Sequence, residues 1–430
     1  GAVLVLMPGK YKISLDSMLG LLVIVFYTYA ILSVTWSDAP ERSIRRLAAI
    51  ILLLAAMMAV VRHLSMRDLI VGTVLTASSF IAIGVLAEIV HKTFMPWDLS
   101  YRFSGTAHPN TQGAYCAFCA IACLYAWRTS KSKLSIGWLV IGAVAVVFLV
   151  LTKSRSNLLG FIFGLGICWY ITTAPQKRLL ANFGIPLALA SGLLLASFLG
   201  IGLADKLDDA ASGIGRGESS VVSLSGRVPL WKNLTRYAGK RLFLGYGYDG
   251  FWTPERIAQI SYEEGWTVPS AHSVAMEIQL SLGLIGLTLF TAVMALATWQ
   301  CANELVVRKA VIYGFPFCLI VFGFVSGIFE SGFAQPSSFD SFTAACSIAL
   351  VAFRRRHSED GNEEQKETRQ FKVDRRDAIS QTRQTAAPAS WKTEEWKVEE
   401  YRDSSAARKA SWKASWMNDD VDDDWGIRKS

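Results

Sequence analysis

The chain has 430 residues, of which 52% are hydrophobic and only 18% are charged, and its mean hydropathy is +0.33. Residues 354–430 hold 17 Lys/Arg and 17 Asp/Glu, whereas residues 1–353 hold 26 and 18 and carry the whole net charge of +8. Soluble domains average about 25% charged residues. The composition of residues 1–353 therefore excludes an ordinary soluble enzyme and predicts a polytopic membrane protein with a polar tail.

The apolar runs define the expected helices. Residues 1–17 are interpreted as an incomplete N-terminal segment, because the apolar stretch at its start is too short to span a bilayer, which takes about 20 residues. We predict an all-α fold with about ten or more transmembrane helices, divided between residues 18–204 and 272–353. The apolar runs lie at 18–36, 44–62, 69–91, 109–127, 134–152, 156–174, 181–204, 273–299, 310–330 and 337–353.

Two polar segments complete the predicted organisation. Residues 205–271 form the one long connection, with eight basic and eight acidic residues. Residues 354–430 have mixed charge and little aliphatic content, so this tail is expected to be disordered, although its five tryptophans can also serve as anchors for a partner or the membrane surface.

The loop charges predict the sidedness. One set of alternate loops, with the start of the tail, carries 14 Lys/Arg and the other carries 7. Because Lys and Arg collect on the cytoplasmic side, the tail is predicted to be cytoplasmic and residues 205–271 to be periplasmic. The outer side nevertheless gathers cationic residues, which favours an anionic ligand that meets the protein from the outer leaflet. They include Arg102, His108, Lys153, Arg155, Arg227, Arg241 and His272.

Two polar stretches adjoin predicted helices on the outer side. Residues 102–113 contain Arg102, His108 and Asn110, and they form either a plain helix entry, capped by Asn110 or Thr106, or part of a ligand site.

The second stretch, residues 152–157, carries Lys153 and Arg155 between two closely spaced runs. A charge near the bilayer centre costs roughly 2.5–3.5 kcal/mol, so these cations either snorkel to lipid phosphates or bind an anion.

The long outer connection holds two further motifs. Ser-Gly-Arg-Val-Pro-Leu-Trp at 225–231 contains Arg227, and Leu-Gly-Tyr-Gly-Tyr at 244–248 contains Tyr246 and Tyr248. The glycines permit a tight turn with aromatic side chains nearby, which suits sugar faces as well as plain loop packing.

Histidine and cysteine placement narrows the chemistry. His272 stands at the start of the eighth run, on the side of the arginines, where a neutral imidazole can accept a proton near pH 7. Cys116, Cys119 and Cys123 occur at helical spacing and are interpreted as packing residues, because no His or carboxylate joins them. No metal site is predicted.

In these motifs the chain resembles the O-antigen ligase and polymerase-like family, and most of all its exopolysaccharide polymerases. The resemblance covers roughly residues 100–290, with one departure, Ser273, where the family often has Asn. The shared motifs occur in order: Ser-Gly-x-x-His-Pro-Asn (104–110), Ser-Arg-Ser (154–156), Ser-Gly-Arg-x-x-Leu-Trp (225–231), Leu-Gly-Tyr-Gly (244–247), Ala-His-Ser (271–273) and Gly-Leu-Ile-Gly-Leu (283–287).

The resemblance implies a GT-C-like inner-membrane glycosyltransferase that uses an undecaprenyl-diphosphate-linked saccharide as donor and needs no metal or other cofactor. It assigns catalytic roles to Arg227 and His272 and matches Arg155 to the family's Ser-Arg pair. We expect His272 to accept the proton of an acceptor sugar hydroxyl, with inversion at the anomeric carbon. The remaining hypotheses are diphosphate binding by Arg155, Arg241 and Lys153, and substrate binding by Arg102, His108, Asn110, Tyr246 and Tyr248.

Two alternatives remain from other classes of protein. A transporter or flippase for the same lipid-linked saccharide also suits outward-facing cations, but it should carry polar residues at bilayer mid-depth, whereas Glu88 and Glu277 lie close to the ends of their runs. A scaffold for other polysaccharide assembly proteins can use the tryptophan-bearing tail, but leaves the His and Arg pattern unexplained.

Overall fold

The computed structural model describes residues 9–130, 132, 135–173 and 227–354, and the regular secondary structure of these residues consists of helices, apart from one isolated β-bridge. The predicted run at 181–204, the first part of the long connection and nearly all of the tail lie outside the described residues. Eleven α-helices occur within the described ranges: α2 (Met18–Leu32), α3 (Pro40–His63), α4 (Met66–Val90), α5 (Pro109–Thr129), α6 (Ile136–Leu151), α7 (Arg155–Thr173), α11 (Arg227–Lys240), α12 (Pro254–Glu264), α13 (Val274–Val306), α14 (Gly314–Gly327) and α15 (Phe339–Phe353).

The described helices confirm an all-α chain with several membrane-spanning segments. Five are long and apolar enough to cross a membrane, namely α3, α4, α7, α13, and α2 with the 3₁₀ turn that extends it to Trp36. Three shorter apolar helices lie at Ile136–Leu151, Val311–Gly327 and Phe339–Phe353. Nine of the ten predicted runs thus coincide with helices. The total number of spans and the GT-C-like arrangement remain predictions.

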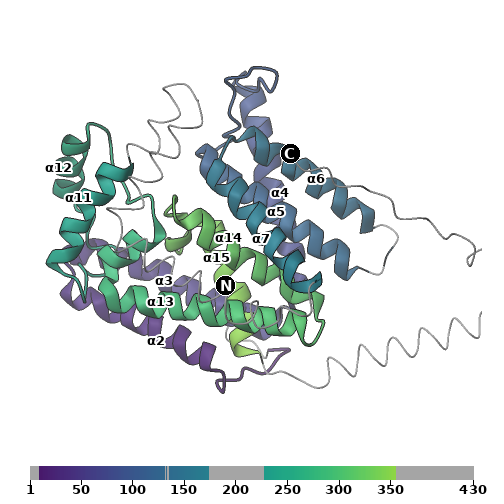
Figure 1. Ribbon diagram of the computed structural model, residues 1–430, viewed down its shortest axis with the longest axis horizontal. Coiled ribbons are helices and arrows are strands. Elements are labelled where there is room, and N and C mark those ends of the chain that lie inside the picture. The colour runs from purple at the N-terminus through teal and green to yellow at the C-terminus, as the bar shows by residue number, and fades with distance from the viewer. Residues whose placement is uncertain (1–8, 131, 133–134, 174–226, 355–430) are drawn as a thin grey trace, which may run out of the picture. The chain divides into compact units, whose positions relative to one another are not determined.

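Helices α4, α5, α6 and α7 lie side by side, with α14 against α7 (Figure 1). Helix α5 is central to this group, since 13 of its 21 residues are buried, including Cys116, Cys119 and Cys123. Small residues allow the close packing, because a Cβ on Gly142 of α6 would stand 3.1 Å from Cys123. The three cysteines are therefore part of the helix-packing core.

Helix α13 runs beside α2 and is broken at Gly283, whose φ is +65°. The segment 242–246 forms hydrogen bonds with backbone groups that the break leaves without partners in the helix. Tyr246 N donates to Leu280 O (2.8 Å) and Leu284 N donates to Leu242 O (2.7 Å). Gly245 also has positive φ, and a Cβ there would stand 2.5 Å from the nitrogen of Gly283. This pairing explains the first glycine of each of the two motifs, Gly245 and Gly283.

Residues 227–271 form a small folded unit attached to the start of α13. Helices α11 and α12 pack around a core that includes Leu230, Phe251 and Ile260 and continues onto Met276 and Leu280 of α13. Trp231 Nε1 donates to Ala271 O (2.8 Å), which ties α11 to the residue before His272. The described part of the predicted outer loop is therefore a structured support.

Replacing Gly283 with Ala should destabilise the protein. The added Cβ would collide with the Phe243 carbonyl, and a non-glycine residue in this conformation costs about 1–3 kcal/mol from backbone strain alone. We expect a lower thermal unfolding midpoint of the detergent-solubilised protein. Gly72→Ala in α4 is the control, because nothing lies within 4 Å of a Cβ there. Equal midpoints for the two variants would contradict the proposed constraint.

Candidate functional site

Polar side chains from four segments meet near the starts of α5, α11 and α13. The Glu330 carboxylate, just after α14, accepts from Arg227 Nη2 (3.2 Å) and from Asn110 Nδ2 (2.6 Å), both at Oε1. Arg102 Nη2 donates to Asn110 Oδ1 (3.4 Å). These four residues and two histidines described below are called the cationic cluster. Its members are Arg102, His108, Asn110, Arg227, His272 and Glu330.

The start of α5 brings two members into the cluster. His108 is the N-cap residue, and its Nδ1 accepts from Asn110 N (3.2 Å), while Pro109 takes the first helical position. The sequence prediction that Thr106 or Asn110 caps this helix is therefore wrong. Because His108 satisfies the free backbone N–H, the Asn110 side chain remains available to bridge Arg102 and Glu330.

His272 lies in a strained turn immediately before α13. Its φ is +50°, which is uncommon for a residue other than glycine and is a recognised feature of functional sites. The ring stacks against Trp266 at 5.6 Å, and its buried Nε2 has no hydrogen-bond partner among the described residues. The neighbouring Ala271 is fixed from both sides, because its N–H donates to Glu277 Oε1 (2.7 Å) and its carbonyl accepts from Trp231.

The electrostatics keep the imidazole of His272 neutral. Burial, and then the charges of Arg227 and His108, lower the pKa of His272 to about 4. Burial, Arg102 and Arg227 also lower the pKa of His108. Both rings are therefore unprotonated near pH 7, which leaves each with a lone pair.

Glu330 is a site residue that the sequence analysis missed. Its position at the end of the apolar run 310–330 is the sequence feature that could have identified it as a candidate. Burial raises the pKa of Glu330, and the ion pair with Arg227 opposes this shift. When Glu330 is ionised, Arg102 and Arg227 still leave the cluster with one net positive charge.

Two predicted diphosphate-binding residues adjoin the cluster. Arg102 Nε donates to Thr152 O (3.1 Å), which places the 152–157 segment beside it. Lys153 has a φ of +52° and its amino group donates to Leu99 O. Arg155 begins α7, is exposed, and makes no hydrogen bond or ion pair with the part of the chain that the structure describes.

Arg241 and Tyr246 lie in a separate network. Arg241 pairs with Asp38 (2.7 Å) and lies over the Tyr246 ring at 5.0 Å, and Arg256 covers the same ring at 4.5 Å. Tyr246 is buried, with its hydroxyl donating to Tyr237 O (2.9 Å). The structure thus gives these two predicted ligand residues a structural role, joining the outer segment to the α2–α3 turn.

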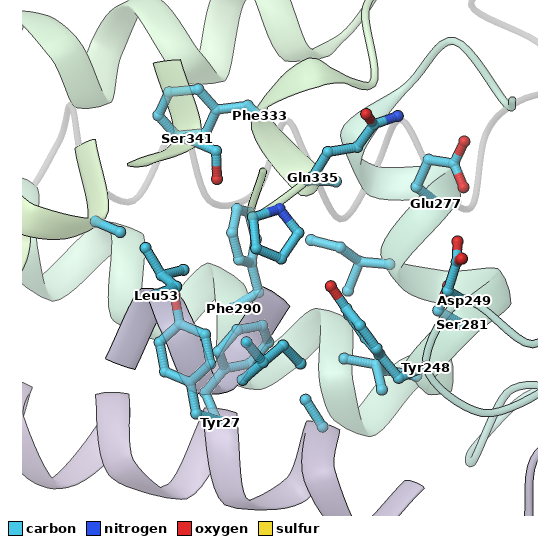
Figure 2. A pocket seen from close by; sticks show the side chains of 18 of the residues that line it. Tyr27, Leu53, Tyr248, Asp249, Glu277, Ser281, Phe290, Phe333, Gln335 and Ser341 are labelled. Carbon is cyan, nitrogen blue, oxygen red and sulfur yellow. The ribbon is translucent and has the colours of Figure 1, made fainter. Parts of the chain in front are cut away.

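Tyr248 belongs to a cavity of about 190 Å³ between α2, α3, α13 and α15. Figure 2 shows Tyr248, Asp249 and Glu277 toward one side and Tyr27, Leu53 and Phe290 toward the other. Asp249 holds Arg42 (2.8 Å) and Arg46 (3.0 Å) at the polar side. Pro269 and Ser270 also line the cavity, so it adjoins the turn that carries His272.

The buried carboxylate of Glu88 organises the segment that carries Arg102. It accepts from Tyr101 Oη, from Ser104 N (2.9 Å) and from Gly105 N (2.7 Å). Gly105 in turn packs directly on Gly84, since a Cβ on Gly84 would stand 3.0 Å from the Cα of Gly105. Glu88 is therefore a structural support for the cationic cluster.

In the described residues, no three His, Cys, Asp or Glu side chains form a group that could hold a metal ion. The positive charge of the cationic cluster comes from the side chains of Arg102 and Arg227.

Comparison with known proteins agrees with the resemblance seen in the motifs. Residues 140–291 match the family described as O-antigen ligase. The chain is 26% identical over 355 residues to an O-antigen ligase of Pseudomonas aeruginosa, covering 77% of this chain and 76% of the relative. It is 24% identical over 334 residues to the exopolysaccharide production protein ExoQ of Rhizobium meliloti, covering 73% and 71%. The predicted family resemblance is thereby confirmed.

Glu88→Ala should lower the thermal unfolding midpoint and increase protease cleavage between residues 93 and 105. The change removes the acceptor of four donor atoms, including the Ser104 hydroxyl, and a buried unsatisfied polar group costs about 1–3 kcal/mol. Glu41→Ala is the control, because the Glu41 side chain is 89% exposed and pairs with exposed Arg45. Cleavage that is no faster than in the control would refute the support role.

Proposed function

We propose that this protein is a membrane glycosyltransferase of the O-antigen ligase or polymerase type, facing the periplasm from the bacterial inner membrane. It transfers or polymerises saccharide from an undecaprenyl-diphosphate-linked donor onto a sugar hydroxyl, in exopolysaccharide or O-antigen synthesis. The observation that carries the proposal is the buried Nε2 of His272, which has no hydrogen-bond partner among the described residues and lies near the charge of Arg227 within a net-positive cluster. The family match over residues 140–291, which include both residues, supports it.

In the proposed reaction the acceptor hydroxyl oxygen attacks the anomeric carbon while the bond from that carbon to the diphosphate oxygen breaks. His272 Nε2 takes the hydroxyl proton, and the diphosphate departs as an anion without needing a proton from the protein. A single displacement of this kind inverts the configuration of the anomeric carbon.

The arginines neutralise the negative charge that develops on the leaving group. Guanidinium groups bind phosphate oxygens bidentately, and fixed cations in a water-poor site contribute several kcal/mol to the barrier reduction. Arg227 and Arg102 are the first candidates, since both already face the cluster, with Arg155 and Lys153 at its edge. Under this proposal guanidinium groups supply the role that a metal ion fills in other transferases.

Glu330 holds Arg227 in place until the donor arrives. An ionised carboxylate on Arg227 accepts from Nη2 at one edge of the guanidinium and leaves other N–H groups to bind phosphate. The incoming diphosphate also changes His272, because a nearby negative charge raises the pKa of an imidazole. A ring with a pKa of about 4 in the free protein thereby becomes a stronger base when the donor is bound.

Replacing either catalytic candidate should abolish function while leaving the protein in the membrane. We expect a loss of about 10²–10⁴-fold for His272→Ala, from the lost proton acceptor, and about 10²–10³-fold for Arg227→Ala. Each variant should be expressed in a strain that lacks the native protein. Its membranes are tested for transfer of lipid-linked saccharide, and its cells for surface glycan. Arg236→Ala is the matched control, since Arg236 lies on the same helix α11 and is exposed. Unchanged product with either site variant would refute the assignment.

The glycan profile of the deletion strain separates the two activities within the proposal. Single repeat units accumulating on lipid carrier indicate a polymerase, whereas complete chains left untransferred indicate a ligase.

The pH profile tests the protonation of His272. Catalysis needs the neutral ring, so protonation of His272 should lower kcat/KM as the pH drops toward about 4, its pKa without donor. The acidic limb of kcat should lie at higher pH, because the bound diphosphate raises that pKa. Arg227→Gln should move the limb of kcat/KM upward by removing a positive charge, and His91→Asn, an exposed histidine after α4, should leave it in place. A downward shift in Arg227→Gln would contradict the proposed electrostatics.

A further inference from the structure

The loop between α4 and α5 holds large apolar side chains in an outward position. Leu99 is 95% exposed, Trp97 is 78% exposed and Met95 is 44% exposed. Each Å² of apolar surface left in water costs about 25 cal/mol, so a water-facing loop has a physical reason to turn such side chains inward.

This loop cannot turn them inward, because it is fixed at both ends. Thr93 N and Phe94 N donate to the Glu88 carbonyl at its start (2.8 and 3.3 Å). At its end, Tyr101 donates to the Glu88 carboxylate and its ring packs against Phe94 at 6.0 Å. Lys153 holds the middle through the Leu99 carbonyl. The exposure of Trp97 and Leu99 is therefore built into the loop.

The surroundings of the loop identify what covers it. It follows directly on α4, whose last turns expose Leu86, Ile89 and Val90 as a membrane-spanning helix exposes side chains to lipid. Helix α6 ends at the same level, since Phe103 N donates to Leu151 O (2.9 Å). The loop thus lies where apolar helices end. Lys92 stands at its start, and Lys153 contacts it at the Leu99 carbonyl. Tryptophan together with lysine is typical of the membrane–water boundary.

We propose that residues 92–101 form an interfacial anchor, with Trp97 and Leu99 inserted into the lipid headgroup layer beside the cationic cluster. The insertion is shallow, because Asp98 lies between the two side chains and its ionised carboxylate stays hydrated while accepting from Ser100 N (2.7 Å). The anchor leads directly to Arg102, so it fixes the cluster at the depth where a lipid-borne phosphate lies. This inference does not depend on glycosyl transfer.

The test places an environment-sensitive nitrobenzoxadiazole (NBD) fluorophore on Leu99→Cys in the full chain, reconstituted in phosphatidylethanolamine–phosphatidylglycerol vesicles. All seven native cysteines are buried, so the new thiol reacts selectively. We expect a blue-shifted emission and stronger quenching by lipids with a nitroxide at acyl carbon 5 than at carbon 12. Gln259→Cys, exposed on the polar helix α12, is the solvent-facing control.

Three outcomes would overturn the proposal. Emission like that of the control, quenched by aqueous iodide, would mean that the loop faces water. A blue shift without nitroxide quenching would mean that a protein surface covers it, and stronger quenching from carbon 12 would mean deep burial. Trp97→Cys gives a second labelling position if Leu99→Cys does not fold.

Discussion

The break in α13 at Gly283 determines where the polar side chains of the candidate site lie. Buried backbone groups must find partners in a bilayer, where each unsatisfied group costs several kcal/mol. The Leu242–Tyr246 segment supplies partners at the break, and Tyr29 Oη donates to Leu282 O (3.0 Å). The folded unit of residues 227–271 is thereby attached to the helix that begins just after His272, and the position of Arg227 on α11 follows from that attachment.

The charges near the site act against one another, and their balance sets the chemistry. Burial and Arg227 both oppose a charge on His272, so the ring stays neutral without any acidic partner of its own. Glu330 has the opposite effect, because its carboxylate forms an ion pair with Arg227. Among the described residues a carboxylate pairs with Arg227 and none bonds to His272, so a lone pair lies within the electrostatic influence of a cation. A displacement with an anionic leaving group needs both.

The sequence predicted those features that depend on local composition. Apolar runs of about 20 residues located nine helices, because length and hydrophobicity alone decide whether a segment can span a bilayer. Local composition does not predict the ion-pair partners of Arg241 and Glu330. Arg241 pairs with Asp38 and Glu330 with Arg227, more than 100 residues away in sequence, and no local pattern encodes such pairs. The His108 cap was missed because histidine ranks low among capping residues.

Many of the cations on the predicted outer side form two sets in the structure. Each arginine of the first set donates to an aspartate, two to Asp38 and two to Asp249, so its charge is largely committed to holding the outer segment on the bundle. In the second set Arg102 and Lys153 reach no carboxylate among the described residues, and Arg155 is exposed. Under the proposed function, a lipid-borne anion meets the cations of the second set, beside the loop of Trp97 and Leu99. Electrostatic attraction and membrane depth therefore favour the same entry point.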